Sequence, residues 1–149
     1  MKILAIDPGE KRIGVAISDP TGTLARPLCV IIHQSRESSA EKIAAIAMEE
    51  GVAMIVVGQA LGTNGEIGPQ ARKSQRLADC LRTMTDCEIV MWDESGTTQA
   101  ARQSRIDLGV PKKKRRGHFD DLAASILLQD YLIANEVSIK RSQVDDEQS

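Results

Sequence analysis

Aromatic residues are nearly absent from this sequence of 149 residues. Trp92, Phe119 and Tyr131 are the only three, so the core must be built from aliphatic side chains. Proteins that hold single-stranded nucleic acid by base stacking use several aromatic rings, and this composition argues against that class. The three cysteines are an odd number without close paired spacing, which predicts reduced thiols rather than a disulfide framework or a zinc site.

The sequence also lacks a large net charge and a long apolar run. Its formal net charge is −2, so any affinity for nucleic acid must come from a local basic patch. No apolar stretch approaches the length of a bilayer-spanning helix, and the N-terminus does not have the layout of a signal peptide. We therefore expect a cytoplasmic protein. Its length is that of one domain, which buries roughly two-thirds of the unfolded surface.

Residues 1–19 carry the most informative pattern in the chain. An apolar run ends at Asp7, a Pro8-Gly9 turn follows, and apolar residues resume at 13–17. This pattern predicts a hairpin with an acid at the end of its first strand. A carboxylate held at a strand end is rigidly placed, so a metal ion or a phosphate can approach it. The alternative is turn chemistry alone, because Asp and Gly both favour turns.

The rest of the chain predicts helices and further strands. The third strand is expected at an edge because Pro27 interrupts it, and two later apolar runs are typical of buried parallel strands. Three antiparallel strands followed by two helix–strand units and two helices indicate an α/β domain with a mixed sheet. We expect one domain over residues 1–138 and a polar, disordered tail over 139–149. The expected strands are 2–7, 12–18, 24–32, 53–58 and 87–92, and the expected helices are 41–50 (capped by Ser38 or Ser39), 69–84, 97–108 (capped by Thr97 or Thr98) and 119–135, the last with Leu122, Ala123, Ile126, Leu127 and Leu132 on its inner face.

Acidic residues stand at the ends of three elements. Asp7 ends the first strand, Asp93 and Glu94 end the last, and Asp120 and Asp121 open the last helix. Strand-end side chains of α/β sheets gather along the carboxyl edge, and Asp120 joins them if its helix begins near that edge. Clustered carboxylates repel one another without a cation, and Mg²⁺ or Mn²⁺ prefers such oxygen ligands. Two ions about 4 Å apart can promote phosphodiester hydrolysis. The alternatives are a helix-dipole role for Asp120 or Asp121 and an ordinary exposed acid at Glu94.

Basic residues lie close to these acids in the sequence. A basic run precedes the last helix and consists of Lys112, Lys113, Lys114, Arg115 and Arg116. It would place positive charge beside the metal site and attract a nucleic-acid backbone with salt-sensitive affinity. Lys11 and Arg12 add charge at the hairpin tip. A solvated loop or turn is the alternative for both groups, and a solvated helix flank is the alternative for Arg72, Lys73 and Arg76.

The ordered set of motifs resembles the YqgF/RuvX family. The opening Asp7-Pro-Gly-x-Lys11-Arg12-Ile-Gly14-Val-Ala-x-Ser18-Asp19 is similar to the start of those proteins. The later matching segments are Ile55-Val-Val-Gly58 with Gly65, Asp93-Glu94-x-x-Thr97-Thr98-x-x-Ala101, and Lys114–Gly117 followed by Asp120-x-x-Ala-Ala and the closing helix to about residue 133. The resemblance implies an RNase H-like fold, with a mixed five-stranded sheet flanked by helices.

This resemblance implies a metal-dependent nuclease. It assigns Asp7, Glu94 and Asp120 as catalytic carboxylates and as ligands of Mg²⁺ or Mn²⁺. The family is described as processing the 5′ end of pre-16S rRNA in ribosome biogenesis, or as resolving Holliday junctions. Two departures bear on substrate affinity. Gln59-Ala60 stands where the family has Leu-Pro, and Ser95-Gly96 stands where it has an arginine, a bidentate phosphate or carboxylate donor that serine cannot replace.

Four functions remain open from the sequence. A nuclease on structured RNA and a nuclease on branched DNA share the same chemistry, and the second needs a homodimer for paired nicks whereas the first allows a monomer. The missing arginine motivates a nucleic-acid-binding module without useful catalysis. An ATP-binding domain of the actin or sugar-kinase type also uses an acid and glycines in a hairpin, but such proteins need two domains, and no Gly-x-x-x-x-Gly-Lys-Ser/Thr loop is present.

Overall fold

A mixed five-stranded sheet forms the centre of the molecule. The computed structural model describes residues 1–62, 64–94 and 119–135. Its elements are β1 (Ile3–Pro8), β2 (Arg12–Ser18), β3 (Ala25–Ile32), α1 (Arg36–Glu50), β4 (Met54–Gln59), α2 (Pro69–Arg82), β5 (Glu88–Asp93) and α5 (Phe119–Ala134). The predicted helix at 97–108, the basic run at 112–116 and the tail at 139–149 lie outside the described residues.

The strand order is β3-β2-β1-β4-β5. β1 pairs antiparallel with β2 and β2 pairs antiparallel with β3, whereas β4 pairs parallel with β1 and β5 pairs parallel with β4. The prediction of three antiparallel strands within a mixed sheet is therefore confirmed. The chain leaves β1 toward one side of the sheet and later returns to its other side at β4, so the order reverses between these two strands. Open α/β sheets bind ligands at the carboxyl ends of the strands beside such a reversal.

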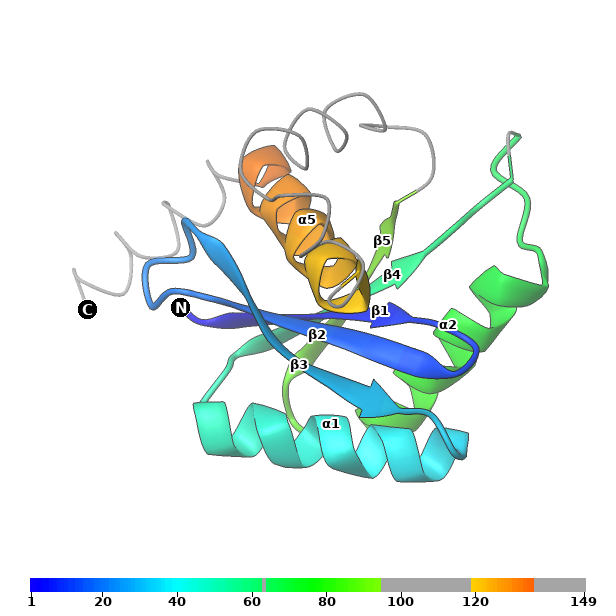
Figure 1. Cartoon of the computed structure of the whole chain (residues 1–149), viewed down its shortest axis with the longest axis horizontal. Helices are drawn as coiled ribbons and strands as arrows, with labels where there is room; N and C mark the ends of the chain where they lie inside the picture. The colour runs from blue at the N-terminus through cyan, green and yellow to red at the C-terminus, as the bar shows by residue number, and fades with distance from the viewer. Residues whose placement is uncertain (63, 95–118, 136–149) are drawn as a thin grey trace.

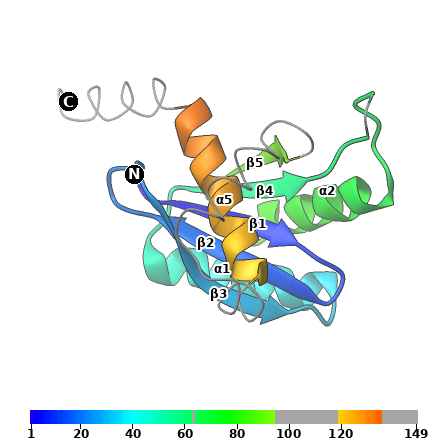
Figure 2. The ribbon, with the colours of Figure 1, turned by 45° about the horizontal axis from the view of Figure 1, so that its top comes forward.

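Helices cover both faces of the sheet. α5 lies across one face, and α1 and α2 lie on the other (Figures 1 and 2). Successive residues of β1 enter opposite cores: Leu4 and Ile6 pack with α1 and α2, whereas Ile3 and Ala5 pack with α5. This explains why β1 and the β4 run 55–57 are apolar without alternation. The core is almost entirely aliphatic, as the scarcity of aromatics predicts.

The first helix begins earlier than the sequence pattern predicts. Ser35 is the N-cap of α1, and its side chain accepts a hydrogen bond from the Ser38 backbone N–H at 3.1 Å. The expectation that Ser38 or Ser39 caps this helix is therefore wrong. Ser39 is buried one turn inside α1, where its hydroxyl lies 2.7 Å from Nδ1 of His33. The predicted end is confirmed, because Gly51 closes α1 in the left-handed conformation.

Two further predictions concern the edge strand and the buried face of the last helix. Pro27 lies in edge strand β3, where the pairing with β2 shifts register between Val15 and Ala16. In α5, the predicted inner residues Ile126, Leu127 and Leu132 are buried, but Leu122 and Ala123 are partly exposed, and Ala124, Leu128 and Tyr131 are buried instead. The sheet-facing stripe thus passes through positions 124, 127–128 and 131 at helical spacing. No helix in the described ranges is both long and apolar enough to cross a bilayer.

Candidate active site

Asp7 lies near the carboxyl end of central strand β1. Its backbone pairs with Gly14 in the antiparallel ladder to β2. Because side chains alternate along a strand, Asp7 shares the α5 face with Ile3 and Ala5. The parallel register of β1 with β4 reaches Ile6 opposite Val57. One residue further, Asp7 is level with Gly58.

Glu94 reaches the same place from the far side of Gly58. Its backbone N–H donates to the Gln59 carbonyl at 2.9 Å, which continues the β4–β5 ladder past the end of β5. A Cβ added to Gly58 would lie 3.3 Å from the Glu94 carboxylate and 2.8 Å from a methyl group of Leu127. The Glu94 carboxylate therefore lies over β4 on the α5 face, in space that only glycine leaves open. Neighbouring strands are about 4.8 Å apart, so Asp7 and Glu94 flank Gly58 at one edge.

Asp93 occupies a different environment from Glu94. Asp93 lies two residues after Met91 and four after Ile89 in β5, so it shares their face of the sheet, which packs against the core beneath α1 and α2. The carboxylate Oδ1 of Asp93 accepts a hydrogen bond from the Leu61 backbone N–H at 3.4 Å. Asp93 thus fastens the segment after β4, and of the two adjacent acids Glu94 is the one on the α5 face.

The direction of α5 brings its first turn toward the same edge. Leu127 lies over Gly58 near the end of β4, and the Tyr131 hydroxyl donates to the Met54 sulfur, at the start of β4, at 3.2 Å. The helix therefore runs opposite to β4, and its N-terminal turn lies toward the carboxyl edge. Asp120 stands in that turn, seven residues before Leu127 and so on the same helical stripe. The side chains of Asp120 and Asp121 are not among those described.

The donor set fits a hard cation. Among the described side chains, no three His, Cys, Asp or Glu residues form a group that could hold a metal ion. Asp7 and Glu94 supply two neighbouring carboxylates, and the third predicted ligand, Asp120, lies outside that set. Carboxylate oxygens are the ligands that Mg²⁺ and Mn²⁺ prefer, so the residues present are compatible with such an ion.

Two predicted basic residues lie in the same hairpin as Asp7. Lys11 and Arg12 are exposed in the tip of the β1–β2 hairpin, and the Lys11 carbonyl accepts a hydrogen bond from the His33 backbone N–H at 2.9 Å. This contact ties the hairpin to the end of β3. The predicted contribution of residues 112–116 falls outside the described chain.

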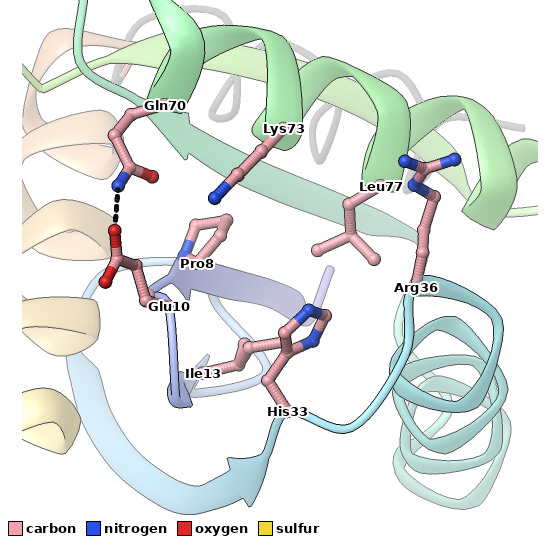
Figure 3. A pocket seen from close by; sticks show the side chains of 9 residues that line it. Pro8, Glu10, Ile13, His33, Arg36, Gln70, Lys73 and Leu77 are labelled. Atoms are coloured by element: carbon pink, nitrogen blue, oxygen red, sulfur yellow. Dashed lines mark hydrogen bonds between the residues drawn. The ribbon is translucent and has the colours of Figure 1, made fainter.

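A pocket that the sequence pattern did not indicate lies on the opposite face of the hairpin. It has a volume of about 180 Å³ and is lined by Pro8, Gly9, Glu10, Ile13, His33, Arg36, Gln70, Lys73 and Leu77 (Figure 3). These residues come from four separate segments, so linear spacing gives no signal for them. Lys73 was expected only on a solvated helix flank, yet it lines this pocket.

The Ser18-Asp19 pair of the opening motif lies away from the site. Ser18 is level with the start of β1, and its buried hydroxyl accepts a hydrogen bond from the Ile3 backbone N–H at 2.8 Å. Burial alone would raise the pKa of Asp19, but hydrogen bonds from the Thr21 hydroxyl and from two backbone amides outweigh it and hold that pKa below its usual value. Asp19 therefore orders the turn at the amino edge of the sheet.

Comparisons with known proteins agree with this arrangement. Residues 1–134 match the family model described as RuvX, Holliday junction resolvase. A Roseiflexus sp. (strain RS-1) protein is 44% identical over 131 residues, covering 88% of this chain and 93% of the relative. One from Chloroflexus aggregans is 46% identical over 132 residues, covering 89% and 93%. Both carry the name "Putative pre-16S rRNA nuclease".

Solved structures show the same fold at low identity. The fowlpox virus Holliday junction resolvase has a TM-score of 0.57 at 14% identity, covering 90% of this chain and 99% of that one. Thermus thermophilus RuvC in complex with a Holliday junction also has a TM-score of 0.57, at 17% identity and with 91% and 96% covered. These neighbours confirm the predicted RNase H-like fold. From the match over residues 1–134 and from its relatives, this chain belongs to the RuvX family.

Proposed function

We propose that this protein hydrolyses phosphodiester bonds of nucleic acid with a divalent cation held by Asp7, Glu94 and Asp120. The observation that carries the proposal is that the Glu94 carboxylate lies over Gly58, on the same face and at the same sheet edge as Asp7 near the end of β1. The position of Asp120 in the first turn of α5 supports its assignment as the third ligand. The nuclease names of the relatives support the reaction class.

The residues divide the chemistry between them. Asp7 is held by the central ladder and Glu94 by its N–H bond to Gln59, so both carboxylates are placed before substrate arrives. A Mg²⁺ or Mn²⁺ ion bound there would activate a water and stabilise charge on the leaving oxygen. Lys11 and Arg12, together with Lys112, Lys113, Lys114, Arg115 and Arg116, bind backbone phosphates and orient the strand.

The proposed substrate is structured RNA, at the 5′ end of pre-16S rRNA, in the cytoplasm. The names of two relatives above 40% identity support this choice over branched DNA. Branched DNA is the second candidate, because the matching family model is described as a Holliday junction resolvase. Paired nicks across a junction need two active sites, so this candidate requires a homodimer.

A cleavage panel tests the reaction and the substrate together. Precursor rRNA, a DNA junction and single strands are each incubated with Mn²⁺, with and without chelator. We expect Asp7→Asn to lower the cleavage rate about 100-fold or more, because a metal ion contributes several kcal/mol to the transition state. Light scattering measures the oligomeric state in parallel. Equal cleavage by the wild type and Asp7→Asn would refute the site, and a strict monomer would count against the junction.

Asp120 and Asp121 provide a matched pair of variants. We expect Asp120→Asn to lose cleavage and Asp121→Asn to retain it, because Asp120 lies seven residues before Leu127, which covers Gly58 beside Glu94, whereas Asp121 lies seven residues before Leu128. Quenching of Trp92 by Mn²⁺ reads ion binding without any need for activity, because Trp92 is the only tryptophan and lies two residues before Glu94. Loss of cleavage in Asp121→Asn alone would transfer the third ligand to that residue.

A further inference from the structure

The pocket behind the hairpin lies at the same sheet edge as the carboxylates but on the opposite face. Its walls come from the hairpin, the segment after β3, the first turn of α1 and the first three turns of α2. Ile13 and Leu77 belong to the core beneath α1 and α2, which fixes the face. The pocket therefore borders the reversal of strand order from the side away from α5, a place where α/β sheets bind ligands.

The lining of the pocket combines an apolar floor with a cationic rim. Pro8, Ile13 and Leu77 provide the apolar surface. Lys73 extends from α2 toward Pro8, and Arg36 extends from α1 toward α2 on the other side of Leu77 (Figure 3). In the described part of the chain, neither cation is in an ion pair. The lining contains two cationic side chains and one acidic side chain, so its net charge is positive.

The one acid of the pocket is turned away from the cations. The Glu10 carboxylate accepts a hydrogen bond from the Gln70 side-chain amide at 3.3 Å, and Figure 3 shows it directed at that amide rather than at Lys73. Gln70 lies in the first turn of α2, which starts after Gly68 without a side-chain cap. The uncapped N–H groups of that turn add positive potential on the same side.

We infer that this pocket binds a phosphate group that carries a sugar. Lys73 supplies charge for the phosphate, and Arg36 adds positive potential from the other side of Leu77. The apolar floor can pack against the carbon skeleton of a ribose. The volume of about 180 Å³ is smaller than the roughly 300–1,000 Å³ of sites for drug-sized ligands, so it admits a sugar phosphate rather than a whole dinucleotide. The phosphate comes either from a nucleic-acid strand or from a free mononucleotide.

Binding there would brace the element that holds Asp7. Pro8, Gly9 and Glu10 line the pocket and follow Asp7 directly in the chain. A ligand in the pocket therefore holds the hairpin tip from the face of α1 and α2, while the Asp7 carboxylate lies on the α5 face. For a nucleic-acid strand this contact would anchor the substrate beyond the cleavage position, and that extension of the inference rests on the proposed function.

The test follows the ring of His33 by NMR during titration without divalent metal. The chain has two histidines, and a His118→Gln variant assigns their signals. Adenosine 5′-monophosphate is expected to give a saturable His33 shift, and adenosine none. We expect Lys73→Met to weaken binding about three- to fivefold, the scale of one exposed charge contact. Lys42→Met is the matched control, because Lys42 is exposed on α1 and does not line the pocket.

Each outcome of the titration has a defined meaning. Competition with short oligonucleotides that carry a 5′-phosphate or a 5′-hydroxyl identifies the source of the phosphate. If both oligonucleotides displace the nucleotide, the pocket binds backbone phosphates; if only the 5′-phosphorylated one does, it binds a strand terminus. If neither displaces the nucleotide, the ligand is a free nucleotide. The inference is overturned if no phosphate ligand shifts His33, or if Lys73→Met and Lys42→Met bind equally. Because no metal and no cleavage enter the titration, its failure is distinct from failure of the nuclease proposal.

Discussion

The two faces of the β1–β2 hairpin carry opposite chemistry at one edge of the sheet. On the α5 face, Asp7 and Glu94 flank Gly58, and a cation suits them. On the face of α1 and α2, Arg36 and Lys73 border the pocket, and an anion suits them. Strand alternation separates the two within a few residues, because neighbouring side chains point to opposite faces. One short hairpin can thus serve as a wall of two sites.

The largest effect is expected from the removal of one carboxylate from the α5 face. We expect Glu94→Gln to lower the cleavage rate about 100-fold and to abolish Mn²⁺ quenching of Trp92, because an amide is a poorer ligand for a hard cation. Asp93→Asn is the matched control, since its side-chain oxygen still accepts the bond from Leu61. Binding of adenosine 5′-monophosphate should be unchanged in both variants. If Asp93→Asn lost cleavage while Glu94→Gln stayed active, Asp93 rather than Glu94 would be the metal ligand.

The contrast between Asp93 and Glu94 also shows which features of the site can be predicted from the sequence. Apolar runs predicted the strands, and the Pro-Gly turn predicted the hairpin, because these depend on local periodicity. The placement of acids at strand ends followed from the same periodicity. Which of two adjacent acids faces α5 depends on the register of β5 against β4, which no local pattern contains; the resemblance to the family chose Glu94.

Features assembled from several segments were not predictable in this way. The pocket joins side chains from the hairpin, the residue after β3 and two helices, so Lys73 resembled any solvated lysine of a helix flank. The cap of α1 was missed because several serines precede that helix, and only the backbone conformation selects Ser35. The inner stripe of α5 was offset because this helix is apolar on more than one face, and packing on the sheet decides which residues are buried.

A methyl group added at Gly9 should disturb the hairpin tip, which borders both sites. A Cβ on Gly9 would lie 2.5 Å from the Arg12 carbonyl oxygen, so the hairpin tip must shift in Gly9→Ala. We expect a stability loss of about 1–3 kcal/mol in urea unfolding, with weaker binding of both Mn²⁺ and adenosine 5′-monophosphate. Gly68→Ala is the control, because its added methyl meets nothing within 4 Å. An effect of Gly9→Ala on one ligand only would mean that the two sites do not share this wall.

A smaller change should affect the α5 face alone. In Gly58→Ala the new methyl would lie 2.8 Å from the buried Leu127 side chain and 3.3 Å from the Glu94 carboxylate, so both side chains must shift. We expect Mn²⁺ affinity, read by Trp92 quenching, to fall about tenfold, as for other residues that position a metal ligand. Nucleotide binding in the pocket should stay at the wild-type value. Unchanged Mn²⁺ affinity would show that Glu94 does not need the space that Gly58 leaves.

The smallest effect is expected at the amino edge, far from either site. The Asp19 carboxylate accepts hydrogen bonds from the backbone N–H groups of Thr23 at 2.8 Å and Leu24 at 3.0 Å, and its pKa is lowered although burial opposes this. A carboxyl whose pKa is lower in the folded state stabilises the fold above its unfolded pKa of about 3.9, and this contribution is lost as pH falls through the folded pKa. Asp19→Asn should therefore lower the free energy of unfolding by about 0.5 kcal/mol at pH 7, the lower range for one hydrogen bond, and by progressively less below pH 4.

Urea unfolding of the wild type and Asp19→Asn at pH 7 and pH 3 measures this difference. An equal loss of unfolding free energy at both pH values would assign the stabilisation to neutral hydrogen bonding rather than to the charge. Unchanged cleavage and nucleotide binding in Asp19→Asn would show that this residue of the opening motif has a structural role only.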